Sequence, residues 1–90
     1  MSYSIDIDLA AQDAIAALPV DALLALAEVF AVLEVAPWHV GRSVNPERNP
    51  ESGVRNFPFG AAGMITYLIV EHERRVDILL ITWSGPVQLS

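Results

Sequence analysis

The sequence contains no lysine and no cysteine among its 90 residues. The missing cysteines exclude a disulfide framework and a thiolate metal site. The missing lysines leave five arginines against eleven carboxylates, which gives a net charge of −6. Nonspecific binding to nucleic acid depends on Lys and Arg side chains that neutralise phosphates. The net charge therefore opposes that kind of binding.

Long apolar runs are also missing. The longest candidate, residues 22–35, is interrupted by Glu28 and Glu34, and a membrane-spanning helix needs roughly 20 apolar residues. The first eight residues, MSYSIDID, have neither the basic nor the apolar segment of a secretory signal. We expect a protein of the cytoplasm that makes no membrane contact. At this length, we expect one domain over residues 1–90.

The charges are unevenly distributed along the chain. Residues 1–40 carry six carboxylates and no cation, whereas residues 41–90 carry five carboxylates and all five arginines. The first half is therefore acidic and the second half is neutral. This asymmetry is compatible with a partner that contacts the neutral half.

The first third of the chain predicts a strand and two helices. Residues 3–7 alternate apolar and polar side chains, as a half-buried strand does. Asp8 then stands at a helix N-cap position before the segment LAAQDAIAAL, residues 9–18, with Leu9 on its apolar face. Pro19 ends this helix and opens the next, because the first turn of a helix needs no amide at that position. We expect two antiparallel helices with a very tight connection.

The second helix is expected over residues 20–35 and is apolar on most of its circumference. Such a helix is either covered on two sides or reserved for a partner. The alternative is an Ala-rich helix that packs on a sheet and presents small residues outward. Residues 36–53 follow as a long loop with many Pro and Gly residues, of the kind that is often functional or mobile.

The last third predicts a three-stranded meander. Strands over Val54–Phe59, 64–70 and 76–83 are separated by the turn signals FGAAG and HERR. The second and third strands are almost continuously apolar, which is typical of central strands covered on both faces. Pro58 places the first strand at an edge or a bulge. Arg55 shares one face of that strand with two Phe residues, and the sequence leaves open which face meets the helices.

This order of elements, with the segments GVRNFPFGAAGMITYLIV and RRVDILLITW, resembles the RelE/ParE family of toxins from bacterial type II toxin–antitoxin systems. The resemblance covers roughly residues 3–83. It implies an α+β fold of order β-α-α-β-β-β, in which a helical hairpin packs on a small, mostly antiparallel sheet. It also implies a cognate antitoxin that wraps the toxin. RelE-like members cut messenger RNA on the ribosome, and ParE-like members inhibit DNA gyrase.

The resemblance also implies a catalytic set for the RNA-cutting members, which need no metal or other cofactor. These members use cations on the second strand, an arginine shortly before a tyrosine on the third strand, and a basic or aromatic residue near the C-terminus. Arg55 lies near one of the second-strand cations, but Phe57 and Met64 stand where two further cations are expected. After Trp83 the chain has no His, Arg or Tyr. Most of the set is therefore missing, and whether the chain is an enzyme stays open.

A cleavage site built from the remaining groups would draw on five candidate residues. Arg55 would hold the phosphate, and Tyr67 or His39 would carry the proton. Arg42 and Arg48 in the loop would bind the RNA backbone. This chemistry needs a base for the 2′-hydroxyl and cations beside the developing phosphorane charge.

The preferred hypothesis is a ParE-like toxin that acts through protein–protein contact and is neutralised by its antitoxin. The antitoxin would lay an amphipathic helix or an extended segment against residues 20–35, with Leu24, Phe30 and Leu33 in the contact, or would add a strand to a sheet edge. The acidity of the first half fits a basic antitoxin segment. A third hypothesis is a decayed toxin or a non-toxic interaction module, such as a homodimer built on the apolar helix.

Overall fold

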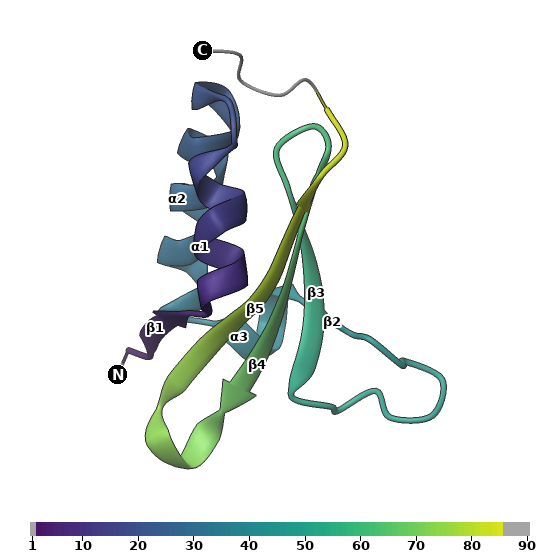
Figure 1. The fold of residues 1–90 in the computed structure, drawn as a ribbon. Coiled ribbons are helices and arrows are strands. Elements are labelled where there is room, and N and C mark those ends of the chain that lie inside the picture. Colours follow the sequence, from purple (N-terminus) through teal and green to yellow (C-terminus); the bar gives the residue numbers. More distant parts are fainter. Residues whose placement is uncertain (1, 86–90) are drawn as a thin grey trace.

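The computed structural model describes residues 2–85, and Figure 1 shows their arrangement. The elements follow in the order β1 (Ser4–Ile7), α1 (Leu9–Ala16), α2 (Val20–Leu33), α3 (Pro37–Val40), β2 (Arg42–Ser43), β3 (Val54–Phe59), β4 (Gly63–Val70), a 3₁₀ turn (Glu71–Glu73) and β5 (Arg75–Trp83). None of the helices within this range is long and apolar enough to cross a membrane.

The five strands form one mostly antiparallel sheet in the order β1-β5-β4-β3-β2. The first strand joins the edge of the sheet by pairing parallel to β5, and the other three pairings are antiparallel. Helices α1 and α2 run antiparallel on one side of the sheet (Figure 1). The predicted α+β fold, with a helical hairpin on a small sheet, is confirmed.

The expectation that β4 and β5 are covered on both faces is wrong. Ile65, Tyr67 and Ile69 point to the helical side and are buried, whereas Met64 and Leu80 on the other side are exposed. The helices cover one face, so the apolar residues of the other face stay in contact with solvent. A continuous apolar run in the sequence can therefore form a strand that is buried on one face only, with apolar side chains on its exposed face as well.

The expectation of an uninterrupted loop over residues 36–53 is wrong in its first part. Pro37 opens the one-turn helix α3, and Arg42 and Ser43 pair with β3 as a fifth strand. A single turn of helix and a two-residue strand are too short to show a hydrophobic periodicity in the sequence. Their stability comes from tertiary contacts rather than from local preference.

The helical hairpin differs from expectation in its details. Asp8 stands at the N-cap of α1, but its side chain makes no capping hydrogen bond. Leu9 is exposed and is not part of the apolar face, which is instead built on Ala11 and Leu18. Helix α2 begins directly after Pro19, as predicted, and ends at Leu33, two residues earlier than predicted.

The core lies between the helices and the inner face of the sheet, and residues of both halves of the chain form it. Arg55 faces this inner side together with Phe59, which settles the orientation that the sequence left open. The buried apolar residues are Tyr3, Ala11, Leu18, Ala22, Leu26, Val29, Leu33, Phe59, Ile65, Tyr67, Ile69, Val76, Ile78 and Ile81.

Candidate functional site

Arg55 is a buried side chain that holds the segment between α3 and β3. Only 9 % of its surface is exposed. Its Nε and Nη2 donate to the carbonyl oxygen of Gly41 at 3.2 and 2.6 Å, and its Nη1 donates to that of Ser52 at 3.1 Å. The guanidinium carbon also lies 5.8 Å from the centroid of the Trp38 ring. The donors that a phosphate would need are therefore engaged with the protein's own backbone.

Tyr67 lies directly opposite Arg55 on β4 and is completely buried. Its hydroxyl donates to the carbonyl oxygen of Pro37 at 2.7 Å. Burial raises the pKa of this phenol above its ordinary value. A proton carrier needs access to the substrate and a pKa near the working pH. The structure instead gives Tyr67 the surroundings of a core residue that anchors α3.

Arg42 and Arg48 are the exposed arginines of the long segment before β3. Neither makes an ion pair with any residue between 2 and 85. Arg42 lines an open groove of about 560 Å³ at the edge of the sheet, and Arg48 is not among the residues of that groove. The two predicted RNA-binding residues are thus exposed, whereas Arg55 and Tyr67 are buried.

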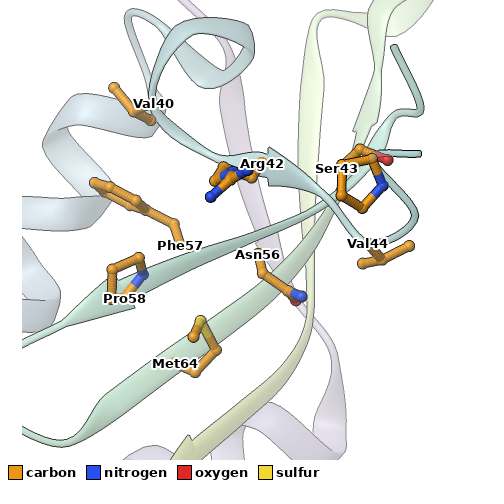
Figure 2. Close-up of a pocket in the computed structure, with 9 residues that line it drawn as sticks. Val40, Arg42, Ser43, Val44, Asn56, Phe57, Pro58 and Met64 are labelled. Carbon is orange, nitrogen blue, oxygen red and sulfur yellow. The ribbon is translucent and has the colours of Figure 1, made fainter. Parts of the chain in front are cut away.

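The groove combines one cation and one amide with apolar walls (Figure 2). Arg42 pairs with Asn56, which in turn pairs with Thr66, so the three form a row across β2, β3 and β4 on the open face. The Thr66 hydroxyl lies 2.7 Å from the Asn56 side-chain oxygen and donates to it. The remaining residues that line the groove are Val40, Ser43, Val44, Pro46, Phe57, Pro58 and Met64.

Among the described residues that line this groove, Arg42 is the one that carries a charge. The Ser43 hydroxyl already donates to the carbonyl oxygen of Asn49 at 2.5 Å. Within residues 2–85, no carboxylate or imidazole lines the groove to take a proton from a 2′-hydroxyl, and His39 lies outside it on the exposed side of α3. The groove has the chemistry to bind an anionic group on an apolar body, and it lacks a general base for cleavage.

The three residues predicted to contact a partner have different positions on α2. Leu24 is 63 % exposed, Phe30 is partly buried against the core, and Leu33 is completely buried. Leu33 is therefore a core residue, and its placement on a contact surface is corrected. The reason is the helical period: Leu33 falls on the same side as Ala22, Leu26 and Val29, which pack on the sheet.

A polar cluster that the sequence did not indicate joins the N-terminus, α3 and the turn before β5. Glu71 accepts hydrogen bonds from the Tyr3 hydroxyl at 2.6 Å and from the Trp38 indole at 2.7 Å. Arg74 donates to Glu71 at 2.9 Å and lies 4.0 Å from the centroid of the Tyr3 ring. The bonds from Tyr3 and Trp38 lower the pKa of Glu71 to about 2. These residues are far apart in the sequence, so no motif reveals them.

Within residues 2–85, no group of three His, Cys, Asp or Glu side chains is placed to hold a metal ion. His72 lies near Glu73 on the exposed turn before β5, and His39 lies on α3. The two histidines therefore belong to different elements, and neither is part of a ligand cluster.

A chain in the crystal structure of the toxin–antitoxin complex RelBE2 from Mycobacterium tuberculosis matches this structure with a TM-score of 0.77. The match covers 93 % of this chain and 100 % of that chain, at 22 % sequence identity. This chain has a RelE-like toxin fold. The resemblance predicted from the sequence is thereby confirmed at the level of the fold. No model of a protein family and no curated protein matches the sequence. The RelE-like fold alone does not decide between RNA cleavage and protein binding.

Proposed function

We propose that this chain is the toxin of a type II toxin–antitoxin system, that it acts in the cytoplasm through protein–protein contact, and that a cognate antitoxin neutralises it. The observation that carries the proposal is the fold shared over 93 % of the chain with a component of a toxin–antitoxin complex. The common core built from both halves of the chain supports the further proposal that residues 1–90 form one domain. DNA gyrase is the target that the ParE resemblance implies.

The positions of the arginines favour protein contact over RNA cleavage. Arg55 is enclosed, Arg74 pairs with Glu71, and Arg75 binds Asp77 at 2.6 Å. Arg42 and Arg48 are left exposed on a protein of net charge −6. A messenger RNA on the ribosome is a polyanion, and binding to it increases with the number of phosphates that the protein neutralises. Two exposed cations supply little of that free energy.

The second candidate function is a RelE-type endonuclease that cuts messenger RNA on the ribosome. The groove around Arg42 and Asn56 favours it, because this groove is the part of the open sheet face that offers a cation and an amide. In this hypothesis the base would be supplied from outside the groove. Arg42→Ala would then abolish RNA cleavage without unfolding the protein.

The test is inducible expression of the chain in a bacterial host, scored for growth and for the integrity of messenger RNA. Growth arrest with intact transcripts supports the proposal, and growth arrest with cut transcripts supports the endonuclease. Supercoiling by purified DNA gyrase in the presence of the protein then tests that target directly. Unimpaired growth would contradict both functions and leave the non-toxic interaction module.

The antitoxin is tested in the same host. A short reading frame that overlaps or adjoins this gene is co-expressed, and restored growth together with co-purification identifies its product as the partner. As a control, the same reading frame is expressed with an early stop codon. If several neighbouring reading frames fail to restore growth, the chain is not part of a toxin–antitoxin pair of this type.

A further inference from the structure

Helix α2 carries an apolar stripe on the side that points away from the core. Val20 and Leu24 on this side are 61 and 63 % exposed, and Val35, two residues beyond the end of the helix, is 71 % exposed. Ala27 and Ala31 lie between them and are also exposed. We call these five residues the α2 stripe. A spacing of three and four residues places Val20, Leu24, Ala27 and Ala31 on one line along the helix, and Val35 follows in the turn after it.

The stripe is not a consequence of core packing. The core side of the helix is formed by Ala22, Leu26, Val29 and Leu33, which are about half a turn away from the stripe. The packing of α2 on the sheet accounts for the buried side of the helix. The stripe takes no part in that packing. A contiguous apolar surface of this kind on a helix marks an interaction site.

The shape of the stripe suits another helix. Ala27 and Ala31 have small side chains, which leave room for the side chains of a partner. The larger side chains of Val20, Leu24 and Val35 protrude farther, on either side of the two alanines. Small side chains at a helix contact allow the two axes to approach to about 8 Å. The 14 residues of α2 span about 21 Å, which corresponds to about four turns of a partner helix.

The charges beside the stripe determine the chemistry of that partner. Asp21 and Glu28 lie along one border, one heptad apart, and Glu34 lies along the other. All three carboxylates are exposed, and the first 40 residues contain no Lys or Arg. A second copy of this helix or an anionic membrane would meet like charge along both borders. A segment with Lys or Arg on both sides of an apolar seam would meet opposite charge.

The two edges of the sheet are poor alternatives for a partner that adds a strand. At the β1 edge, the Tyr3 amide donates to the carbonyl oxygen of Glu34 at 2.7 Å, and the Ile7 carbonyl accepts from the Gln12 side chain at 2.9 Å. At the other edge, β2 pairs with β3 at Arg55 and Asn56, and Pro58 beyond it has no amide hydrogen to donate. A partner therefore finds a more favourable contact on the helical face than at an edge.

We propose that the α2 stripe binds a basic amphipathic helix, whose apolar seam packs on Leu24, Ala27 and Ala31 and whose Lys and Arg side chains face Asp21, Glu28 and Glu34. The identity of the helix as a segment of the antitoxin rests on the proposed function. The surface and the chemistry of its occupant rest on exposure and charge alone. The contact keeps Leu24 from the sequence-based prediction and replaces Phe30 and Leu33 with residues of the stripe.

The test uses the full chain and three labelled 18-residue helical peptides that share a Leu seam flanked by Arg and differ in the register of the seam. A fourth peptide, with Glu in place of Arg, is the control. Fluorescence anisotropy measures affinity at 50 and 300 mM salt, and amide chemical shifts map the contact. We expect an Arg peptide to bind at α2 and to weaken with salt, and the Glu peptide not to bind.

Two variants make the test specific to the stripe. We expect Leu24→Glu to weaken binding at least about tenfold, because it puts a charge into the apolar contact. The matched control is Leu80→Glu on the opposite face of the sheet, where the replaced side chain is 49 % exposed; we expect a change below about twofold. The double variant Asp21→Asn/Glu28→Gln should reduce the salt dependence. Circular dichroism shows that each variant is folded.

Three results would overturn the inference: no binding by any Arg peptide, shifts centred on the sheet, or an unchanged affinity in Leu24→Glu. Self-association that Leu24→Glu abolishes would also overturn it, because the occupant would then be a second copy. The proposed function fails independently. Binding at α2 without growth arrest supports the surface and contradicts the toxin, whereas growth arrest without binding supports the toxin and contradicts the surface.

Discussion

Arg55 and Tyr67 face each other across β3 and β4, and both donate to backbone carbonyls of the segment that precedes β3. Arg55 holds Gly41 and Ser52, and Tyr67 holds Pro37. Hydrogen bonds from these two polar side chains hold the segment against the sheet, whereas apolar packing holds the helices there. The pair that the family resemblance assigned to catalysis therefore has a structural task in this chain.

Arg55→Ala should destabilise the protein by about 2–4 kcal/mol, because the hydrogen bonds from a charged group are lost and the carbonyl oxygens that accept them are left unpaired. Urea unfolding measures the change. Arg48→Ala, at an exposed position in the same segment, is the control and should stay within about 0.5 kcal/mol. Lost growth inhibition with unchanged stability would instead assign Arg55 a direct part in activity.

Gly41→Ala should disturb the contact of Gly41 with Arg55 and Tyr67. A methyl group at Gly41 would overlap the Tyr67 hydroxyl, and the Gly41 carbonyl accepts two bonds from Arg55. We expect a loss of about 1–3 kcal/mol in the free energy of unfolding. Combining Gly41→Ala with Tyr67→Phe removes the overlapping oxygen and should recover part of that loss. Simple additivity of the two changes would show that the residues are not coupled.

Tyr67 should make stability fall at alkaline pH. Burial raises its pKa in the folded state, so above the ordinary value of 10.0 the unfolded chain loses a proton that the folded protein keeps. The contribution is complete below pH 10 and disappears as the pH rises through the folded pKa. Tyr67→Phe should cost about 1–2 kcal/mol at neutral pH and flatten the alkaline fall. Unfolding curves between pH 8 and about 11 show the difference, and an equally steep fall in the variant would refute it.

Glu71 should protect the fold on the acid side. Hydrogen bonds from Tyr3 and Trp38 lower its pKa from 4.5 to about 2. Its contribution is therefore present above pH 4.5 and is lost as the pH falls toward about 2. Carboxyl carbon NMR reads the titration directly. In Glu71→Gln the free energy of unfolding should change less between pH 4.5 and about 2 than in the unmodified protein. Glu47→Gln in the exposed loop is the control. A Glu71 titration midpoint near 4.5 would show that the cluster does not form in solution.

The sequence predicted the strands of the C-terminal half closely. The structure places β3 at Val54–Phe59, as predicted, and begins β4 and β5 one residue earlier than predicted. Apolar runs bounded by Gly-rich or charged turns are local signals, so they can be recognised without the rest of the chain. The same runs did not reveal that Met64 and Leu80 face solvent, because burial depends on where the helices lie.

The candidate sites were less predictable than the elements. Leu24 belongs to the exposed stripe, but Leu33 lies in the core, and the choice between them depends on which side of α2 meets the sheet. The residues of the polar cluster, Tyr3, Trp38 and Glu71, are separated by more than thirty positions along the chain. Contacts at such separations have no local pattern, so a single sequence does not display them.

The sequence by itself determined the α+β class, the order of the main elements, the acidity of the first 40 residues and the lack of most of the cations that RNA cleavage would use. These features depend on local periodicity and on composition. The tertiary structure alone decided that Arg55 and Tyr67 are buried, that β2 joins the sheet, and that the apolar stripe of α2 points outward. Each of these depends on how elements pack together, and packing fixes which face of an element is left for solvent or for a partner.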